Sequence, residues 1–419
     1  MQALPGFRDF LPADCAVRSY IFAKWREVSR RYGFVEFDGP VLEELELFKK
    51  KSGQEIAKQL YAFTDQGGRE IALRPEMTPT LARIVAAAQR DFRKPMKWFC
   101  IPQMFRYERP QRGRLREHYQ YNCDIIGEAS LDADIELIAA CIDVLRSFGF
   151  SSDDVVVRIS DREFWIDFLR AQNVPEDQWQ QTLEIIDKSE REPREKTAAR
   201  LGDLADIVLA VLDGGGRSEK LERLLDGLRQ RGLAEFASID LRIVRGLAYY
   251  TGVVFEAFDL GGKLRAIAGG GRYDNLVAQL SDGAASLPAV GFAMGDVVLG
   301  ELIREHPAAR AQMDAAVALE QQLDVYVVIA KEERRPDALA TVQALRDQHL
   351  RVDYSLGAAK VGKQFQNAEH LGARQAVLFG DEWPQVKVKN LATREEQLIV
   401  REELLAHLVP PANLSARSS

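Results

Sequence analysis

The sequence of 419 residues is poor in the residues that build disulfide frames and zinc sites: it has four cysteines and five histidines. Cys15, Cys100, Cys123 and Cys141 stand far apart, without the two-residue spacing of a zinc or redox pair. Three of them lie in apolar segments, which favours reduced thiols over disulfides. We therefore expect a cytoplasmic protein without a structural zinc site.

Long apolar runs are missing as well. No stretch approaches the roughly 20 apolar residues of a membrane span, and the N-terminus has no basic stretch followed by an apolar one. We therefore expect no membrane partner. The net charge of −7 gives no sign of wholesale nucleic-acid binding, although a local basic patch is compatible with it. With 46% apolar and 28% charged residues, the chain has the balance of a soluble protein of two or three domains.

Internal repeats and a dinucleotide-binding fingerprint are also absent. The glycine row 269–271 does not show the GxGxxG spacing between a strand and a long helix, so a dinucleotide fold is not supported. Residues 264–268 before it are predicted as a strand. Three adjacent glycines allow the backbone to approach a ligand closely.

What the sequence does have is a concentration of arginine in residues 105–120, FRYERPQRGRLREHYQ. An apolar run at 98–101 precedes it, and Pro110 and Gly113 punctuate a turn, so we predict a strand, a tight basic loop and a second strand. Arginine grips phosphate and carboxylate groups through paired hydrogen bonds. Taken alone, such a run is more often a solvated basic hairpin.

Elsewhere in the first half, Glu76 and Thr78 stand beside the start of a predicted helix. A carboxylate and a hydroxyl at this spacing can hold an ammonium group, or they can simply cap the helix. The other predicted elements are a helix at 14–31, a strand at 34–37, a hairpin turn at 66–69, a helix at 132–148 and a strand at 155–159.

The second half divides into blocks of different pattern. Residues 164–233 read as helical and inserted between strands, and strands are predicted again at 245–256. Residues 289–295 lead into a helix at 297–303. After a connector, strands and helices alternate from residue 324, which indicates an α/β domain of parallel type.

Five stretches taken together resemble the histidyl-tRNA synthetases, a family of class II aminoacyl-tRNA synthetases. They are GFRDFLP at 6–12, RPEMT at 74–78, FRYERPQRGR at 105–114, RGLAYYTG at 245–252 and AGGGRYD at 268–274. RGLxYY and GGRYD are signatures of this family, whereas the arginine loop is shared by class II synthetases generally.

The resemblance implies an α+β catalytic domain over residues 1–305, built on an antiparallel sheet flanked by helices. A helical insertion at about 165–235 would reach toward the acceptor stem of tRNA. A connector (306–322), an α/β anticodon-binding domain (323–408) and a disordered tail (409–419) would follow. The family resemblance further implies a homodimer formed through the first helix, the next strand and Pro40.

The implied activity is that of a histidine–tRNA ligase. Histidine attacks the α-phosphorus of ATP to give histidyl-adenylate and pyrophosphate, and is then transferred to the 3′ end of tRNA(His). ATP is a substrate, and Mg²⁺ is expected with it. The resemblance assigns Arg106 to the carboxylate and α-phosphate, Arg245 to the α-phosphate from the other side, and Arg114 to the outer phosphates. The residues implied to bind ATP are Arg106, Arg114, Tyr119 and Arg245.

The residues implied to bind histidine surround both ends of the substrate. Glu76 and Thr78 match the contacts to the α-amino group. Gln120, Asp124 and Tyr250 match the groups around the imidazole, with Tyr249 and a loop at 269–273 as the pocket wall. A pocket of hydrogen-bonding partners rejects isosteres by a factor of about 10⁴ or more, so no editing domain is expected.

Two positions depart from the family pattern. Ala248 replaces the usual Asp of RGLDYY, and Val298 stands where the class II pattern GLER has an arginine that stacks on adenine. Valine can pack on a purine but offers no cation.

An alternative function is therefore that of a catalytically altered synthetase-like regulator, or of a tRNA or histidine sensor. The presence of Arg106, Arg245 and the C-terminal domain favours the ligase. A generic amino-acid ligase would leave that domain without a role.

The predicted C-terminal domain has a few polar residues that are candidates for contact with RNA. The polar residues Lys360, Lys363, Gln364 and Gln366 begin a predicted helix, and Lys387 and Lys389 lie on a predicted strand. They are equally compatible with RNA contact and with solvated surface.

Overall fold

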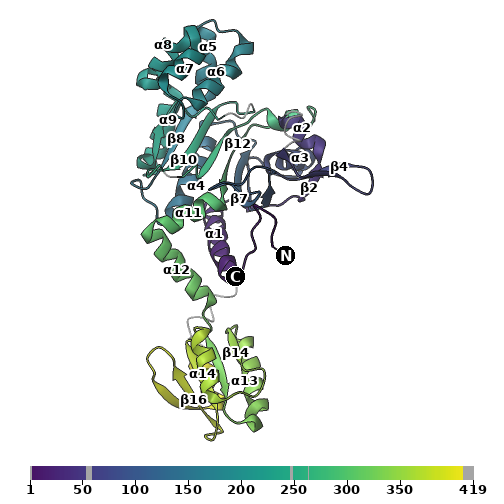
Figure 1. Ribbon diagram of the computed structural model, residues 1–419, viewed down its shortest axis with the longest axis vertical. Coiled ribbons are helices and arrows are strands. Elements are labelled where there is room, and N and C mark those ends of the chain that lie inside the picture. The colour runs from purple at the N-terminus through teal and green to yellow at the C-terminus, as the bar shows by residue number, and fades with distance from the viewer. Residues whose placement is uncertain (1, 53–58, 246–248, 263, 409–419) are drawn as a thin grey trace. The chain divides into compact units, whose positions relative to one another are not determined.

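The computed structural model describes residues 2–52, 59–245, 249–262 and 264–408. Ala248 and the predicted disordered tail lie outside these residues. The chain divides into two compact units, Met1–Met313 and Asp314–Ser419 (Figure 1). Within the described part of the chain, no helix combines the length and the apolar character needed to cross a membrane.

The first unit is built on a nine-stranded sheet with the order β1-β5-β7-β12-β11-β10-β8-β9, and β6 pairs with β7. The pairs are antiparallel except β1 with β5 and β8 with β9, so the predicted antiparallel sheet is confirmed in its main part. The strands are β1 (Val35–Glu36), β5 (Met96–Cys100), β6 (Gln103–Phe105), β7 (Glu117–Ile126), β8 (Val155–Asp161), β9 (Ala237–Ile239), β10 (Val253–Asp259), β11 (Ala268–Arg272) and β12 (Ala289–Gly295).

Helices α1 (Pro12–Arg31) and α4 (Leu131–Ser147) contact each other, and α4 also packs on β7, β8, β11 and β12. The apolar residues Tyr20, Ile21, Trp25 and Val28 form a buried stripe along α1, and Val17 at its start is half-buried. Trp25 on this stripe stacks on Tyr121 of β7, with ring centroids 5.5 Å apart. This packing fixes β7, the strand that enters the candidate site.

A small second sheet, with the order β2-β4-β3, carries the segment that contains Glu76. Its strands are β2 (Leu42–Glu44), β3 (Ala62–Thr64) and β4 (Glu70–Leu73). The antiparallel pairing of β3 with β4 confirms the predicted hairpin. Helices α2 (Leu45–Ser52), α3 (Thr78–Ala88) and α10 (Leu276–Leu280) contact one another beside it.

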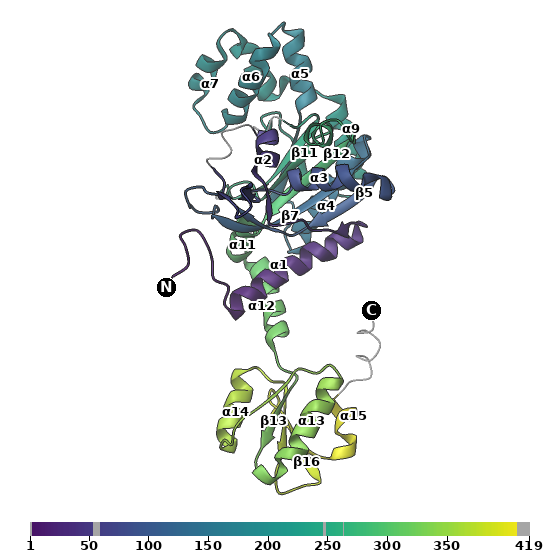
Figure 2. The ribbon, with the colours of Figure 1, turned by 90° about the vertical axis from the view of Figure 1, so that its right-hand side faces the viewer.

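The predicted helical block lies at one end of the first unit (Figures 1 and 2). It consists of α5 (Arg162–Ala171), α6 (Glu176–Lys188), α7 (Arg194–Leu201) and α8 (Ala205–Ala210), whereas the last predicted helix, α9 (Glu219–Gln230), packs on α4 and β8. The chain leaves the sheet at the end of β8 and returns to it at β9, so the block is inserted between neighbouring strands.

Two strand predictions were wrong. β10 begins only at Val253, because Arg245 has a left-handed φ of +51° and residues 249–252 form no ladder. β11 begins at Ala268 and therefore contains the glycine row, which was expected in a loop. A Cβ atom on Gly270 would lie 2.3 Å from the carbonyl oxygen of Gly291. The glycine row is a strand because it pairs with β10 and β12, and the lack of side chains allows β12 to approach this closely.

Helix α11 (Asp296–Glu305) follows β12 directly, and α12 (Pro307–Gln321) covers most of the predicted connector. The second unit holds a sheet with the order β14-β13-β15-β16-β17. The predicted parallel pairing holds for β14, β13 and β15, whereas β16 and β17 are antiparallel. Its elements are β13 (Val325–Ile329), α13 (Arg335–Asp347), β14 (Val352–Tyr354), α14 (Val361–His370), β15 (Gln375–Phe379), β16 (Gln385–Asn390), β17 (Glu396–Val400) and α15 (Leu404–Leu408).

One residue considered for RNA contact is buried inside the second unit. The Gln364 side chain is 0% exposed. Its Nε2 donates to the carbonyl of Ile329 at 2.8 Å, and its Oε1 accepts from the Ile329 amide at 2.9 Å. Gln364 therefore fastens α14 to β13, a role that its place in a polar segment did not indicate.

Candidate active site

Two cavities share a wall on one face of the large sheet. The smaller has a volume of about 100 Å³ and the larger about 670 Å³. The residues that line both are Arg106, Gln120, Arg245, Gly269 and Ala293. Two arginines thus stand where the cavities meet.

All six residues predicted to bind histidine line the smaller cavity. They are Glu76, Thr78, Gln120, Asp124, Tyr249 and Tyr250, and Tyr273 joins them. The rings of Tyr249 and Tyr250 lie 4.6 Å apart, centroid to centroid. Burial raises the pKa of both phenols well above its ordinary value, so each hydroxyl stays protonated and can donate a hydrogen bond.

Asp124 lies at the buried end of this cavity. Burial raises the pKa of Asp124 to about 7, although the hydroxyl of Tyr273, which donates to its Oδ1, acts in the opposite direction. A Cβ atom on Gly291 would lie 1.9 Å from the same Oδ1. Gly291 on β12 therefore leaves the room that the carboxyl group occupies.

Glu76 lines the same cavity and lies beside the start of α3. The cap residue of α3 is Met77, and no side chain caps this helix end, so the structure does not support the alternative of helix capping. Glu76 instead forms an ion pair with Lys51 of α2. The Lys51 side chain is 1% exposed, and its Nζ lies 4.1 Å from the centre of the Tyr249 ring. No sequence signal separated Lys51 from its neighbours Lys49 and Lys50.

Arg106 and Arg245 are held by different means. Arg106 donates from Nε to the carbonyl of Pro75 at 2.9 Å. Arg245 donates from Nη1 to Glu256 Oε1 at 2.9 Å and lies over the ring of Tyr250. A Cβ atom on Gly269 would be 1.5 Å from Arg245 Nη1, so this guanidinium lies directly above the glycine row.

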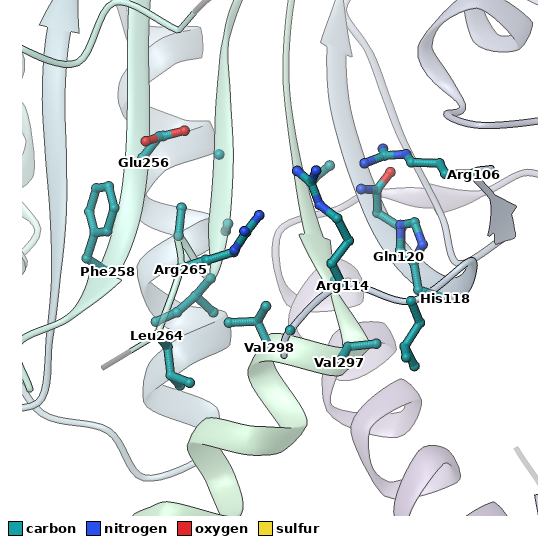
Figure 3. A pocket seen from close by; sticks show the side chains of 18 of the residues that line it. Arg106, Arg114, His118, Gln120, Glu256, Phe258, Leu264, Arg265, Val297 and Val298 are labelled. Atoms are coloured by element: carbon teal, nitrogen blue, oxygen red, sulfur yellow. The ribbon is translucent and has the colours of Figure 1, made fainter. Parts of the chain in front are cut away.

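The other arginines of the predicted basic loop have divided roles. Arg114 lines the larger cavity and pairs with Glu108 at 2.5 Å. Arg112 pairs with Glu301 of α11 at 3.2 Å and lines neither cavity. The loop is therefore only partly solvated surface, because Arg106 and Arg114 extend into the larger cavity (Figure 3).

His118 also lines the larger cavity, although it was not among the residues predicted from the sequence. Burial, aided by the positive charges of Arg106, Arg8 and Arg114, lowers the pKa of His118 to about 3. The imidazole is therefore neutral near pH 7. The alternation of side chains along a strand could have revealed it, since His118 shares its face of β7 with Gln120 and Asp124.

Tyr119, predicted to bind ATP, lines neither cavity. The same alternation turns it to the opposite face of β7, where its ring lies 5.1 Å from that of Phe22 on α1. Its hydroxyl accepts a hydrogen bond from Arg18 at 3.4 Å. The structure thus places Tyr119 on the α1 side of β7, away from both cavities, and its contact with ATP stays a prediction.

Other signature residues hold the scaffold. Arg272 of β11 forms an ion pair with Asp134 of α4 at 2.5 Å. In the N-terminal arm, Arg8 pairs with Glu117 at 2.6 Å and with Asp296 at 2.9 Å. These contacts fasten β11, β7 and α11 around the cavities.

Comparisons with known proteins agree with this geometry. The family model Histidyl-tRNA synthetase matches residues 6–296, and the model Anticodon binding domain matches residues 324–409. The histidine–tRNA ligase of Opitutus terrae is 45% identical over 97% of both chains. The chloroplastic/mitochondrial histidine–tRNA ligase of Arabidopsis thaliana is 40% identical over 93% of this chain and 83% of its own.

Among solved structures, the histidyl-tRNA synthetase of Nostoc sp. PCC 7120 matches with a TM-score of 0.77. It covers 97% of this chain and 98% of its own, at 24% identity, and so supports the fold alone. The matched family models account for nearly the whole of both units, and relatives well above 30% identity span almost the full chain. The chain belongs to the histidyl-tRNA synthetase family.

Proposed function

We propose that the chain is a histidine–tRNA ligase that makes histidyl-adenylate from histidine and ATP and then charges tRNA(His). The observation that carries the proposal is the shared wall of the two cavities. The smaller is lined by hydrogen-bonding groups and the larger by arginines, and Arg106 and Arg245 line both. A carboxylate bound in one cavity would meet a phosphate bound in the other between these two cations.

Activation forces two anions together, so the main task of the site is to neutralise charge and fix geometry. Arg106 would bridge the histidine carboxylate and the α-phosphate, and Arg245 would approach that phosphate from the other side. Glu256 and the ring of Tyr250 hold Arg245 in place. Arg114 would bind the outer phosphates, and pyrophosphate would leave through the larger cavity.

Histidine would be recognised at both ends. Glu76 and Thr78 would bind its ammonium group, and Gln120 and Asp124 would reach the imidazole. Above pH 7 the Asp124 carboxylate can accept a hydrogen bond from a ring N–H. An analogue that lacks this N–H would leave the second oxygen of a buried carboxylate without a donor, since Tyr273 reaches only Oδ1, and this gives strong discrimination.

Mg²⁺ would accompany ATP, because Mg²⁺ prefers phosphate oxygens, waters and one or two carboxylates. Glu256, the carboxylate that lines the larger cavity, is already paired with Arg245, so phosphate oxygens and waters would supply most of the ion's ligands. The ion would neutralise the outer phosphates. In the described residues, no group of three or more His, Cys, Asp or Glu side chains is arranged to hold a metal.

The close relatives, named as ligases over nearly the whole chain, support a ligase rather than a regulator or sensor. The anticodon-binding domain would provide the second contact with tRNA(His). We further propose a cytoplasmic homodimer. Its interface would include the edge strand β1 and the segment after Pro40. Apolar residues are exposed in both: Val35 of β1 is 64% exposed, and Val41 and Leu42 after Pro40 are exposed as well.

The test is histidine-dependent exchange of pyrophosphate into ATP. The wild-type protein is expected to catalyse it, and Arg106→Ala to lose activity by a factor of about 10²–10³, typical for removal of one group that stabilises developing charge. Arg112→Ala is the matched control, since it removes an arginine from the same loop but outside both cavities. No exchange by folded wild-type protein would overturn the proposed function, and near-normal exchange by Arg106→Ala would refute its assigned role.

A further inference from the structure

The larger cavity has two chemically different ends. Arg106, Arg114, His118 and Arg245 gather at the end that adjoins the smaller cavity. Away from that end lie the apolar side chains of Phe258, Leu264 and Val298 (Figure 3), and Ala266 and Ile267 also line the cavity. On the basis of the proposed function, the triphosphate of ATP belongs at the first end and the adenine base at the second. A purine face is apolar, and its transfer from water to such a wall is favourable.

Arg265 is a cation at this apolar end. It lies in the loop between β10 and β11, and its side chain extends into the cavity, toward the space above Val298 and opposite Arg114 (Figure 3). Arg265 is exposed, and it has no hydrogen-bond or ion-pair partner among the residues that the structure describes. Arg114 and Arg245, by contrast, are paired with Glu108 and Glu256.

The floor beneath this guanidinium is Val298, which is buried to 9% exposure. The family pattern has an arginine at this position, reaching the base from α11. Here the cation comes instead from the facing loop, and the position on α11 is apolar. An arginine guanidinium is planar and stacks on flat π systems, so it can cover a base that rests on a valine.

We propose that Arg265 binds the adenine base of ATP by stacking its guanidinium on the ring, in place of the arginine that is missing at position 298. The inference rests on the proposed function and names a residue that no sequence motif assigns. Arg265 forms no hydrogen bond or ion pair with the described residues, so removal of its side chain leaves the fold intact. Its removal weakens the binding of the nucleotide and leaves the binding of histidine unchanged.

The experiment compares Arg265→Ala with wild type in pyrophosphate exchange and in binding of histidyl-sulfamoyl-adenosine. This adenylate analogue carries the base but no outer phosphates. We expect the KM for ATP and the Kd for the analogue both to rise roughly tenfold, within the range of a desolvated cation–π contact. The KM for histidine and the melting temperature should stay at their wild-type values. Arg265→Lys, which keeps the charge but loses the plane, should recover only part of the affinity.

The matched control is Arg170→Ala, because Arg170 is an exposed arginine of α5 that pairs with Asp167 and lines neither cavity. An unchanged KM for ATP in Arg265→Ala would overturn the inference. So would a raised KM for ATP with an unchanged Kd for the analogue, since it would place Arg265 on the outer phosphates. Wild-type protein that neither exchanges pyrophosphate nor binds the analogue would instead refute the proposed function.

Discussion

At the scale of single residues, the site depends on absent side chains as much as on present ones. Gly269 and Gly291 each lie beneath a charged group, Arg245 and Asp124 respectively, at distances no Cβ atom could tolerate. Both glycines belong to central strands, where glycine usually weakens packing. Here the missing side chains are what allow two charged groups to lie flat against the sheet.

Gly269→Ala should therefore displace Arg245 rather than unfold the protein. The atom in conflict is the far end of a flexible side chain, and the hydrogen bonds of β11 are unaffected. We expect pyrophosphate exchange to fall by a factor of about 10²–10³, as for loss of one charge-stabilising group, with a melting temperature close to wild type. Gly300→Ala is the control, since a Cβ there finds its nearest neighbour at an ordinary 3.6 Å. Normal exchange by Gly269→Ala would mean that Arg245 is not needed in this position.

Asp124 should make stability depend on pH. Its pKa is about 7 in the folded protein against a reference of 3.8, so the folded state holds a proton that the unfolded state has lost. Stability relative to Asp124→Asn should then fall as the pH rises from about 4 to about 7, and stay level above that. Denaturation of both proteins without ligands over this range measures the difference. A difference in unfolding free energy between the two proteins that does not change with pH would contradict the raised pKa of Asp124.

At the scale of elements, α2 brings a lysine against two residues of the smaller cavity, Glu76 and Tyr249. Lys51 pairs with Glu76, the carboxylate proposed to hold the substrate ammonium group. Two ammonium groups would compete for one carboxylate. Lys51→Met should therefore lower the KM for histidine severalfold and leave the KM for ATP unchanged. Lys50→Met is the control, because Lys50 pairs with the exposed Asp282 outside the cavity. A higher KM for histidine would show instead that Lys51 positions Glu76.

The alternation of side chains along a strand predicted much of this site, but it can do so only at positions that carry a side chain. The alternation along β7 places Gln120 and Asp124 on one face, and the family signatures supplied Glu76, Tyr249 and Tyr250. The glycine row was mistaken for a loop because glycine carries no pattern, and its strand is imposed by β10 and β12. Lys51 and Arg265 could not be found from spacing, since each enters the site from an element whose position depends on tertiary packing.

At the scale of the whole molecule, we expect the two units to have separate tasks. The cavities proposed to bind histidine and ATP are both lined by residues of the first unit. In the second unit, Lys389 pairs with Glu396 at 2.7 Å, and Lys387 lies near Glu382 and Glu396. These lysines are largely neutralised by their neighbours.

Lys360 and Lys363 at the start of α14 are exposed and have no ion-pair partner in the described part of the chain, so they are the cations available to RNA phosphates. The double substitution Lys360→Ala and Lys363→Ala should raise the KM for tRNA(His) in charging while histidine-dependent pyrophosphate exchange stays unchanged. The logarithmic salt dependence of tRNA binding should become shallower by about 0.7–0.9 for each phosphate that the variant no longer neutralises. Lys331→Ala is the control, since Lys331 is paired with Asp381 in the same unit. An unchanged KM and salt slope would assign α14 to solvated surface, whereas a parallel loss of exchange would mean that the two units do not act separately.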